Sequence, residues 1–122
     1  MAKIDDVMNE FVEQVDEIVF STIVSMDDAT PVTGYSTDES IDITIPVAFM
    51  TEVARKGMMA TENSNFGKAE DILLTTDTNF IVIRMIPETN YMHCVVLTKQ
   101  GNWGIAKVLM SKFAKKFKEV LP

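Results

Sequence analysis

Two runs of sequence joined by a four-residue turn decide the fold: residues 80–86, FIVIRMI, and residues 91–98, YMHCVVLT, with PETN between them. Alternate side chains leave opposite faces of a strand, and in both runs both faces are largely apolar. A strand that is apolar on both faces must be covered on both faces. The two runs therefore predict adjoining strands in the middle of a sheet, with helices above and below it.

Length and composition exclude several classes of protein. A chain of 122 residues fits one domain, and its single cysteine excludes an internal disulfide framework. No apolar run approaches the roughly 20 residues of a membrane span, and residues 1–10 lack the basic start and apolar middle of a signal peptide. A net charge of −7 argues against a nucleic-acid binder. We expect a protein of the reduced cytoplasm that neither binds nucleic acid nor inserts into a membrane.

The segments around the central pair can be assigned from their periodicity. Apolar residues at three- and four-residue spacing predict an amphipathic helix that starts near residue 4 and ends near residue 17. Residues 18–26 and 32–36 predict a hairpin with its turn at 27–31. The half-polar alternation of residues 69–76 is typical of an edge strand.

The last helix is predicted to start after Asn102, a good N-cap residue. Its apolar face is expected to consist of Trp103, Ala106, Leu109, Met110, Phe113, Phe117 and Val120, with lysines opposite. The basic end of the chain could be a membrane or nucleic-acid patch, but a solvated helix face whose cations suit the helix C-terminus is the interpretation we favour. If the acidic first helix lies on the same face of the sheet, the outer charges of the two helices are complementary.

A second helix is predicted to begin near Thr44, with Pro46 tolerated in its first turn. Its apolar residues cover more of the circumference than the stripe of a surface helix: Ile45, Val47, Ala48, Phe49, Met50, Val53, Ala54, Met58, Met59 and Ala60. Loose core filling by methionine would explain part of this width. We favour a helix that also faces a partner, because a monomer rarely exposes so large an apolar patch.

The sequence contains no strong motif for catalysis or for phosphate binding. Gly67 and Lys68 lack the earlier glycine and the following hydroxyl residue of a phosphate-binding loop. His93 and Cys94 are neighbours on a strand, so their side chains point to opposite faces and cannot share a proton.

The acidic residues at 27–28 and 38–42 lack the ligand spacing of a calcium loop and fit turns and caps. Arg84 is a cation in a central strand, and it is expected to reach the sheet edge or to meet an acid such as Glu70 or Asp71. We expect no catalytic residues, no metal site and no cofactor.

The order of elements and three stretches of sequence resemble the roadblock family, which includes dynein light chains and bacterial and archaeal regulators of Ras-like GTPases. The stretches are STIVSMDDATPVTGYSTDESID, FGKAEDILLTTDTNFIVIRMI and, most of all, MHCVVLTKQGNWGIAKVLM. In the last of these, Asn102, Gly104 and Ala106 match the family's Asn-x-Gly-x-Ala entry into the final helix. One difference is visible: Ala29 and Thr30 stand where the family's first hairpin usually has a glycine.

The resemblance implies an α+β fold for residues 1–122 as a single domain, in the order αββαβββα. It implies a five-stranded antiparallel sheet with two helices on one face and one on the other. It also implies a homodimer formed through the second helix and the third strand. The residues expected at this dimer or partner interface are Phe49, Met50, Glu52, Val53, Arg55, Lys56, Gly57, Met59, Ile72 and Leu74.

Two functions are compatible with that resemblance. The one we favour is a homodimeric module, itself not an enzyme, that binds a Ras-like small GTPase and regulates it by ordering the GTPase's own machinery. The alternative is a structural adaptor or light chain that works without nucleotide dependence in a motor or membrane-associated complex. An enzyme or small-ligand sensor that uses a pocket near His93 and Cys94 is the weakest interpretation.

Overall fold

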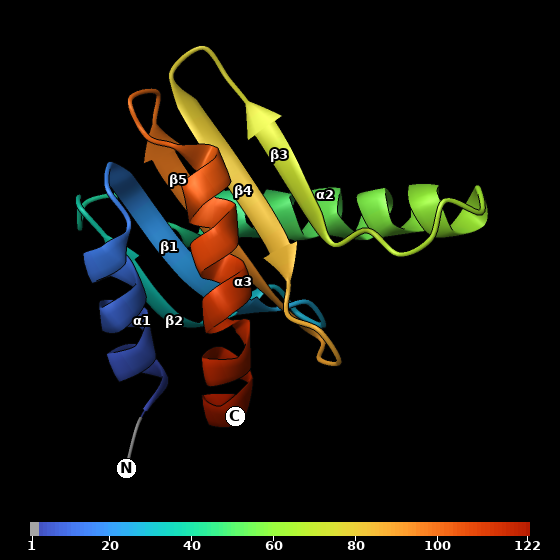
Figure 1. The fold of residues 1–122 in the computed structure, drawn as a ribbon, viewed down its shortest axis with the longest axis horizontal. Coiled ribbons are helices and arrows are strands. Elements are labelled where there is room, and N and C mark those ends of the chain that lie inside the picture. The colour runs from blue at the N-terminus through green and yellow to red at the C-terminus, as the bar shows by residue number, and fades with distance from the viewer. Residues whose placement is uncertain (1–2) are drawn as a thin grey trace.

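A computed structural model describes residues 3–122 and shows an α+β fold of three helices on a five-stranded antiparallel sheet (Figure 1). The elements follow one another as α1 (Ile4–Gln14), β1 (Ile18–Ser25), β2 (Thr30–Ser36), α2 (Thr44–Asn63), β3 (Asp71–Thr75), β4 (Asn79–Met85), β5 (Tyr91–Thr98) and α3 (Trp103–Val120). This is the predicted order, with β3 shorter than expected.

The strand order in the sheet is β2-β1-β5-β4-β3. β5 therefore lies in the centre, where the apolar character of its two faces predicts it, and β4 lies between β5 and β3. β3 pairs only with β4 and forms one edge, as its half-polar sequence predicts. β2 forms the other edge.

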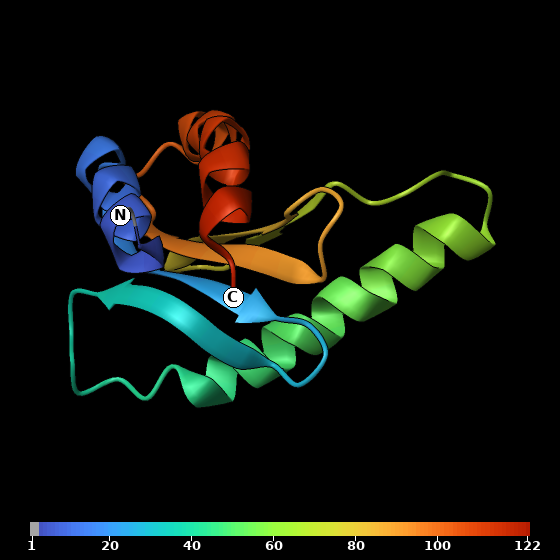
Figure 2. The same cartoon turned by 90° about the horizontal axis from the view of Figure 1, so that it is seen from below.

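Two cores cover the two faces of the sheet. α1 and α3 lie on one face and α2 lies on the other (Figures 1 and 2). Phe11, Met110 and Phe117 fill the core beneath the helix pair, together with Val82 and Val95 from the sheet. The core beneath α2 is formed by Phe20, Val24, Met26, Val47, Ala54, Ile83, Met92, Cys94 and Val96.

His93 and Cys94 show how the alternation places side chains. His93 points into the core of the helix pair, where its Nε2 lies 2.7 Å from the hydroxyl oxygen of Ser21 and its ring packs edge-on against Phe11 and Phe117. Cys94 points into the core beneath α2. The expectation that the two side chains lie on opposite faces is confirmed.

α1 and α3 lie side by side on their face of the sheet, and a salt bridge joins Lys116 Nζ to Glu10 at 2.9 Å. The basic end of the chain is thus partly engaged with the acidic first helix, which agrees with the solvated-face interpretation. Both partners are more than half exposed, so the pair is worth at most about 1 kcal/mol. Among residues 3–122 there is no helix with the length and apolar character to span a membrane.

The start of α3 departs from the prediction. Asn102 caps the helix as expected, since its side-chain oxygen accepts a hydrogen bond from the amide of Ile105 at 3.0 Å. Trp103, however, is 40% exposed and takes no part in the core. Its assignment to the core face was wrong, because the buried stripe of α3 begins only with Ala106.

The turn between β1 and β2 contains a strained residue. Ala29 has a φ of 58°, in the left-handed region that favours glycine. This is the place where the chain lacks the glycine usual in the hairpin that it resembles. β1 and β2 still pair antiparallel up to Ser25 and Thr30 beside this turn, so the fold tolerates the strain at Ala29.

Candidate interaction surface

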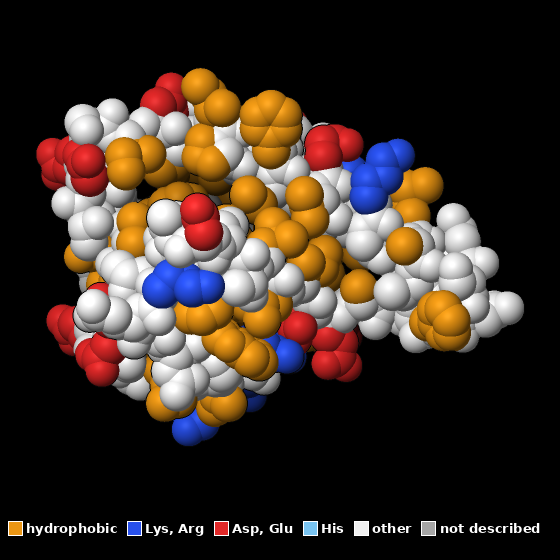
Figure 3. All heavy atoms as spheres, turned by 90° about the horizontal axis from the view of Figure 1, so that it is seen from above, with side chains coloured by type: hydrophobic (Ala, Val, Ile, Leu, Met, Phe, Trp, Pro, Cys, Tyr) orange, Lys and Arg blue, Asp and Glu red, His pale blue; other side chains and the backbone are white. Residues whose placement is uncertain are grey.

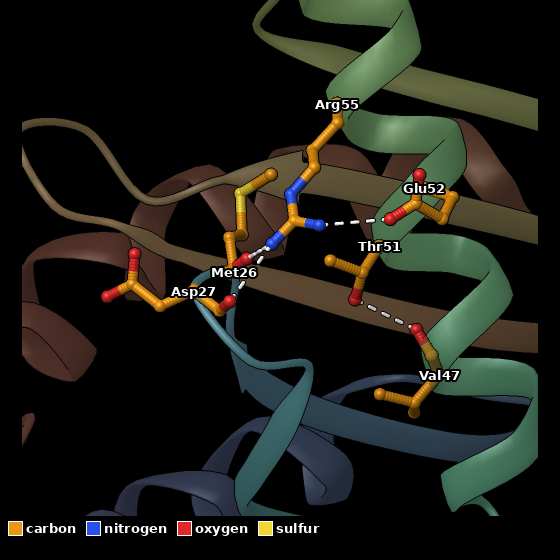
Figure 4. Close-up of polar contacts among 6 residues, drawn as sticks. All are labelled: Met26, Asp27, Val47, Thr51, Glu52 and Arg55. Carbon is orange, nitrogen blue, oxygen red and sulfur yellow. Dashed lines mark hydrogen bonds and ion pairs between the residues drawn. The ribbon is translucent and has the colours of Figure 1, made fainter.

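Helix α2 contacts the sheet through a narrow stripe. Val47, Thr51 and Ala54 are its buried residues, and their spacing places them on one side of the helix. The hydroxyl of Thr51 donates to the carbonyl oxygen of Val47 at 2.8 Å, which satisfies a polar group inside the core (Figure 4). Met50, Val53 and Met58 pack on the margin of this core, and the side of the helix opposite the buried stripe does not contact it.

The C-terminal half of α2 projects past the sheet. In Figures 1 and 2 the helix crosses beneath the strands and continues beyond β3, and the chain returns to β3 along a loop. A 20-residue helix is about 30 Å long, whereas the sheet covers only part of that length. The projecting turns expose a side of α2 that the domain itself does not cover.

Large apolar side chains lie on the uncovered side of α2. Ile45 is 62% exposed, Phe49 is 67% exposed and Met59 is 51% exposed, and Phe66 in the following loop is 82% exposed. Hydrophobic side chains can be followed in Figure 3 from the body of the domain out along the extension that α2 forms. Isolated exposed apolar residues are ordinary, but a series along one helix is typical of a contact surface.

A shallow depression joins α2 to the edge strand. It has a volume of about 640 Å³, and its walls are formed by Phe49, Glu52, Val53, Lys56, Gly57 and Ile72. We call this depression, together with Met59 and Leu74, the α2–β3 surface. A Cβ on Gly57 would lie 2.7 Å from Cδ1 of Ile72, so the missing side chain allows the helix to pass close to β3.

The edge of β3 belongs to the same surface. Ile72 and Leu74 leave β3 on the face that α2 covers, and both are only half-buried. Ile72 packs against the core beneath α2, whereas Leu74 belongs to neither core. One side of β3 has no strand beside it in the part of the chain that the structure describes. An edge of this kind can pair with another chain.

Arg55 is held by contacts within the domain. Its guanidinium donates hydrogen bonds to the carbonyl oxygens of Met26 and Asp27, in the turn after β1, and Nη1 lies 2.9 Å from the carboxylate of Glu52 (Figure 4). The side chain therefore ties α2 to the turn between β1 and β2. Its charge is largely engaged before any partner binds.

The ten residues predicted for the interface fall into two groups. Phe49, Glu52, Lys56 and Met59 are exposed, and Met50, Val53, Arg55, Gly57, Ile72 and Leu74 are half-buried. Six of them meet in the depression. Met50 instead packs on the core beneath α2, and Arg55 binds the turn after β1. Sequence reasoning missed two exposed apolar residues that flank α2, Ile41 before it and Phe66 after it. For Phe66 there was a signal, because an aromatic residue stands among the turn-forming residues of ENSNFG.

The buried ionisable groups do not form a reactive pair. Burial lowers the pKa of His93 to about 3 and raises the pKa of the Cys94 thiol to about 12. The histidine is therefore neutral and the thiol protonated near neutral pH, on opposite faces of the sheet. No group of three or more metal-ligating side chains lies close enough together for a metal ion within residues 3–122. Recognition by shape and apolar contact is what the α2–β3 surface offers.

Comparison with solved structures identifies the fold. A Roadblock/LC7 domain from Streptomyces avermitilis superimposes with a TM-score of 0.84 at 13% identity, covering 97% of each chain. Myxococcus xanthus MglB gives a TM-score of 0.84 at 8% identity, covering 96% of this chain and 93% of MglB. MglC from the same organism gives 0.64 at 19% identity, covering 93% and 94%. No protein-family model and no curated protein sequence matches the chain. The fold that the sequence resemblance implies is confirmed.

Proposed function

We propose that this chain, which has the fold of a Roadblock/LC7 domain, is a homodimeric interaction module that binds and regulates a Ras-like small GTPase. The observation that carries the proposal is the α2–β3 surface: an overhanging helix with exposed Phe49 and Met59, beside an unpaired strand edge. Such a surface is costly to leave in water, and a second copy of the chain covers it in a symmetric way.

Homodimerisation would cover the exposed side of α2 and pair the free edge of β3 at the same time. Two β3 edges that pair antiparallel would continue the sheet from one protomer into the next, and each overhanging α2 would then lie beneath the partner's strands. Phe49 and Leu74 would lose most contact with water in this arrangement, since Phe49 is 67% exposed and Leu74 belongs to neither core. We expect a total buried area on the order of 1,200 to 2,000 Å².

A GTPase partner is supported by the sequence resemblance to a family that includes regulators of Ras-like GTPases, and by the fold shared with Myxococcus xanthus MglB. Glu52 and Lys56 are exposed polar residues on the outer side of α2, next to the apolar contacts, as rim residues of a recognition surface are. The proposed dimer carries these polar residues twice, once on each protomer. A single GTPase would therefore meet residues of both protomers.

Any stimulation of hydrolysis would come from groups of the GTPase itself. The chain has only two arginines, and both are engaged internally: Arg55 binds the turn carbonyls, and Arg84 Nη1 binds Asp71 at 2.9 Å. An arginine finger must reach into the partner's active site. We therefore propose that this domain orders the GTPase's own catalytic groups and contributes no cation of its own.

The test is nucleotide-dependent capture from lysate of the source organism. Lysate is applied to the immobilised protein in two parallel runs, one with a non-hydrolysable GTP analogue and one with GDP. The variant Phe49→Asp and the control Val108→Asp, which adds the same charge on the opposite face of the sheet, are immobilised and treated in the same way. We expect a small GTPase retained only with the GTP analogue, lost with Phe49→Asp and kept with Val108→Asp. Partners retained equally with both nucleotides would instead support the nucleotide-independent adaptor.

A further inference from the structure

Three exposed apolar side chains lie on α3, on the face of the sheet opposite α2. Trp103 is 40% exposed, Ile105 is 57% exposed and Val108 is 55% exposed, all within the first two turns of the helix. None of them belongs to the core of the helix pair. Neither the fold nor the proposed dimer accounts for their exposure.

Two of these side chains, Trp103 and Val108, line a groove between α3 and β4, which we call the α3 groove. Its volume is about 350 Å³, and it is formed by Arg84, Trp103, Gly104, Lys107, Val108 and Ser111. Gly104 and Ser111 are small, so a partner can approach the helix backbone between the larger side chains. Figure 1 shows why the groove is open: among the described residues, α3 is the last helix of its layer on this side, and no helix of that layer lies over β3.

The charges in the groove are unbalanced. Arg84 Nη1 lies 2.9 Å and Lys107 Nζ lies 3.1 Å from the same carboxylate oxygen of Asp71. Two cations thus share one anion, and the Nε of Arg84 is buried without a hydrogen-bond partner among residues 3–122. The first turn of α3 carries no acidic residue, so the positive end of the helix dipole adds to the same field. This excess of positive charge stands out on a chain whose net charge is −7.

We propose that the α3 groove binds an acidic segment of a partner protein, with a carboxylate next to an apolar side chain. The carboxylate would approach Lys107 and Arg84, which Asp71 neutralises only in part. The apolar side chain would pack on Trp103 and Val108. An aromatic wall beside a cation is a common arrangement for such short-segment contacts.

The overall charge favours a protein segment over the other acidic ligands. Nucleic acid and anionic membranes bind through many phosphates spread over a wide surface. A chain of net charge −7 would repel them outside this one groove. A short segment that places one or two carboxylates in the groove meets the local positive charge only.

The groove is independent of the proposed dimer. α2 and α3 lie on opposite faces of the sheet (Figure 2). A homodimer formed through the α2–β3 surface would therefore present two α3 grooves, one on each protomer. The module could hold an acidic partner there while the α2–β3 surface is occupied.

The probe is a phage-displayed library of random twelve-residue peptides, selected on the full-length protein and counter-selected on Lys107→Glu. Enriched peptides are synthesised and titrated, with the fluorescence of Trp103 as the readout. It is the only tryptophan of the chain and it lines the groove. We expect peptides with acidic residues next to apolar ones, and a saturable blue shift of the Trp103 emission.

Variants test whether the α3 groove is the site where the selected peptides bind. Lys107→Glu is expected to weaken the peptide at least tenfold, while Lys68→Glu, the same reversal at an exposed loop lysine, leaves binding unchanged. Phe49→Asp should also leave peptide binding unchanged, so that a failure of the proposed dimer can be told apart from a failure of the groove. If Lys107→Glu does not fold, Val108→Asp at a 55% exposed position replaces it. No enriched peptides, or equal binding to Lys107→Glu, would overturn the proposal. So would a Trp103 shift produced by phosphatidylserine vesicles or an oligonucleotide but by no peptide.

Discussion

The close approach of α2 to β3 can be tested by adding one methyl group at Gly57. In an open helix, replacing glycine with alanine stabilises the protein by about 1 kcal/mol. Here the new Cβ would lie 2.7 Å from Cδ1 of Ile72, whereas ordinary contacts begin at 3.4 Å. Cδ1 must therefore move by about 0.7 Å, which forces the Ile72 side chain off its preferred rotamer at a cost of about 0.5 to 1.5 kcal/mol. The two effects nearly cancel, so we expect Gly57→Ala to leave the free energy of unfolding almost unchanged.

The same change made in an Ile72→Val background should behave differently. Valine lacks the Cδ1 atom, and the next nearest atom, Cγ1, lies 3.6 Å from the built Cβ. Gly57→Ala should then give the full stabilisation of about 1 kcal/mol, so the double-mutant cycle has a coupling free energy of about 1 kcal/mol. Urea unfolding of all four proteins at one fixed concentration measures it, since dimerisation makes stability depend on concentration. An equal gain in both backgrounds would show that the helix does not pass Ile72 at this distance.

Three further predictions concern the core beneath the helix pair and the turn between β1 and β2. Phe113→Ala should cost about 3 to 5 kcal/mol, because the buried ring packs 5.5 Å from that of Phe11, and an unchanged melting midpoint would show that α3 docks differently. Ala29→Gly should stabilise the protein by about 1 kcal/mol by relieving the strain at a φ of 58°, measured by urea unfolding, and a loss of stability would contradict this. Burial lowers the pKa of His93 from 6.5 to about 3, so the unfolded chain binds one more proton between these pH values. Stability should therefore fall by about 1.4 kcal/mol per unit as pH drops through this window, and His93→Gln should remove that share of the slope. Identical slopes for the two proteins would contradict the neutral, buried histidine.

The division of the sheet into two faces could be predicted from the sequence. Alternation along a strand is a local property, so His93 and Cys94 could be assigned to opposite faces without any knowledge of their neighbours. The same reasoning placed Val82 and Ile83 in different cores, as the structure has them. Beyond the adjoining central pair and the edge strand near residues 69–76, the order of the strands in the sheet was not predicted, because periodicity does not say which strands are neighbours.

Contacts between distant elements were harder to predict. Arg84 was expected to meet an acid such as Glu70 or Asp71, and the register of β3 against β4 decides the outcome, because it places Asp71 directly opposite Arg84. The bonds of Arg55 to the turn after β1 had no signal in the sequence. They depend on how α2 crosses the sheet, which its own apolar pattern does not determine.

Trp103 shows where helical periodicity fails. Its position three residues before Ala106 suggests the buried side of α3, yet the ring lies in the α3 groove. The wheel of a helix gives directions around its axis but does not say where along the axis the sheet ends. The first turn of α3 lies beyond the continuous part of the core, so its apolar residues face solvent. Ile105 and Val108, outside the buried stripe, were the overlooked signal.

The central claim is that the α2–β3 surface joins two copies of this chain, and the mass of the protein in solution tests it most directly. Light scattering at micromolar concentration is predicted to give about 27 kDa, twice the 13.7 kDa of one chain. Phe49→Asp, which places a charge on the exposed apolar side of α2, should give the mass of a single folded chain, while Val108→Asp should remain a dimer. A wild-type protein that is monomeric at this concentration, or a Phe49→Asp variant that remains dimeric, would contradict the account.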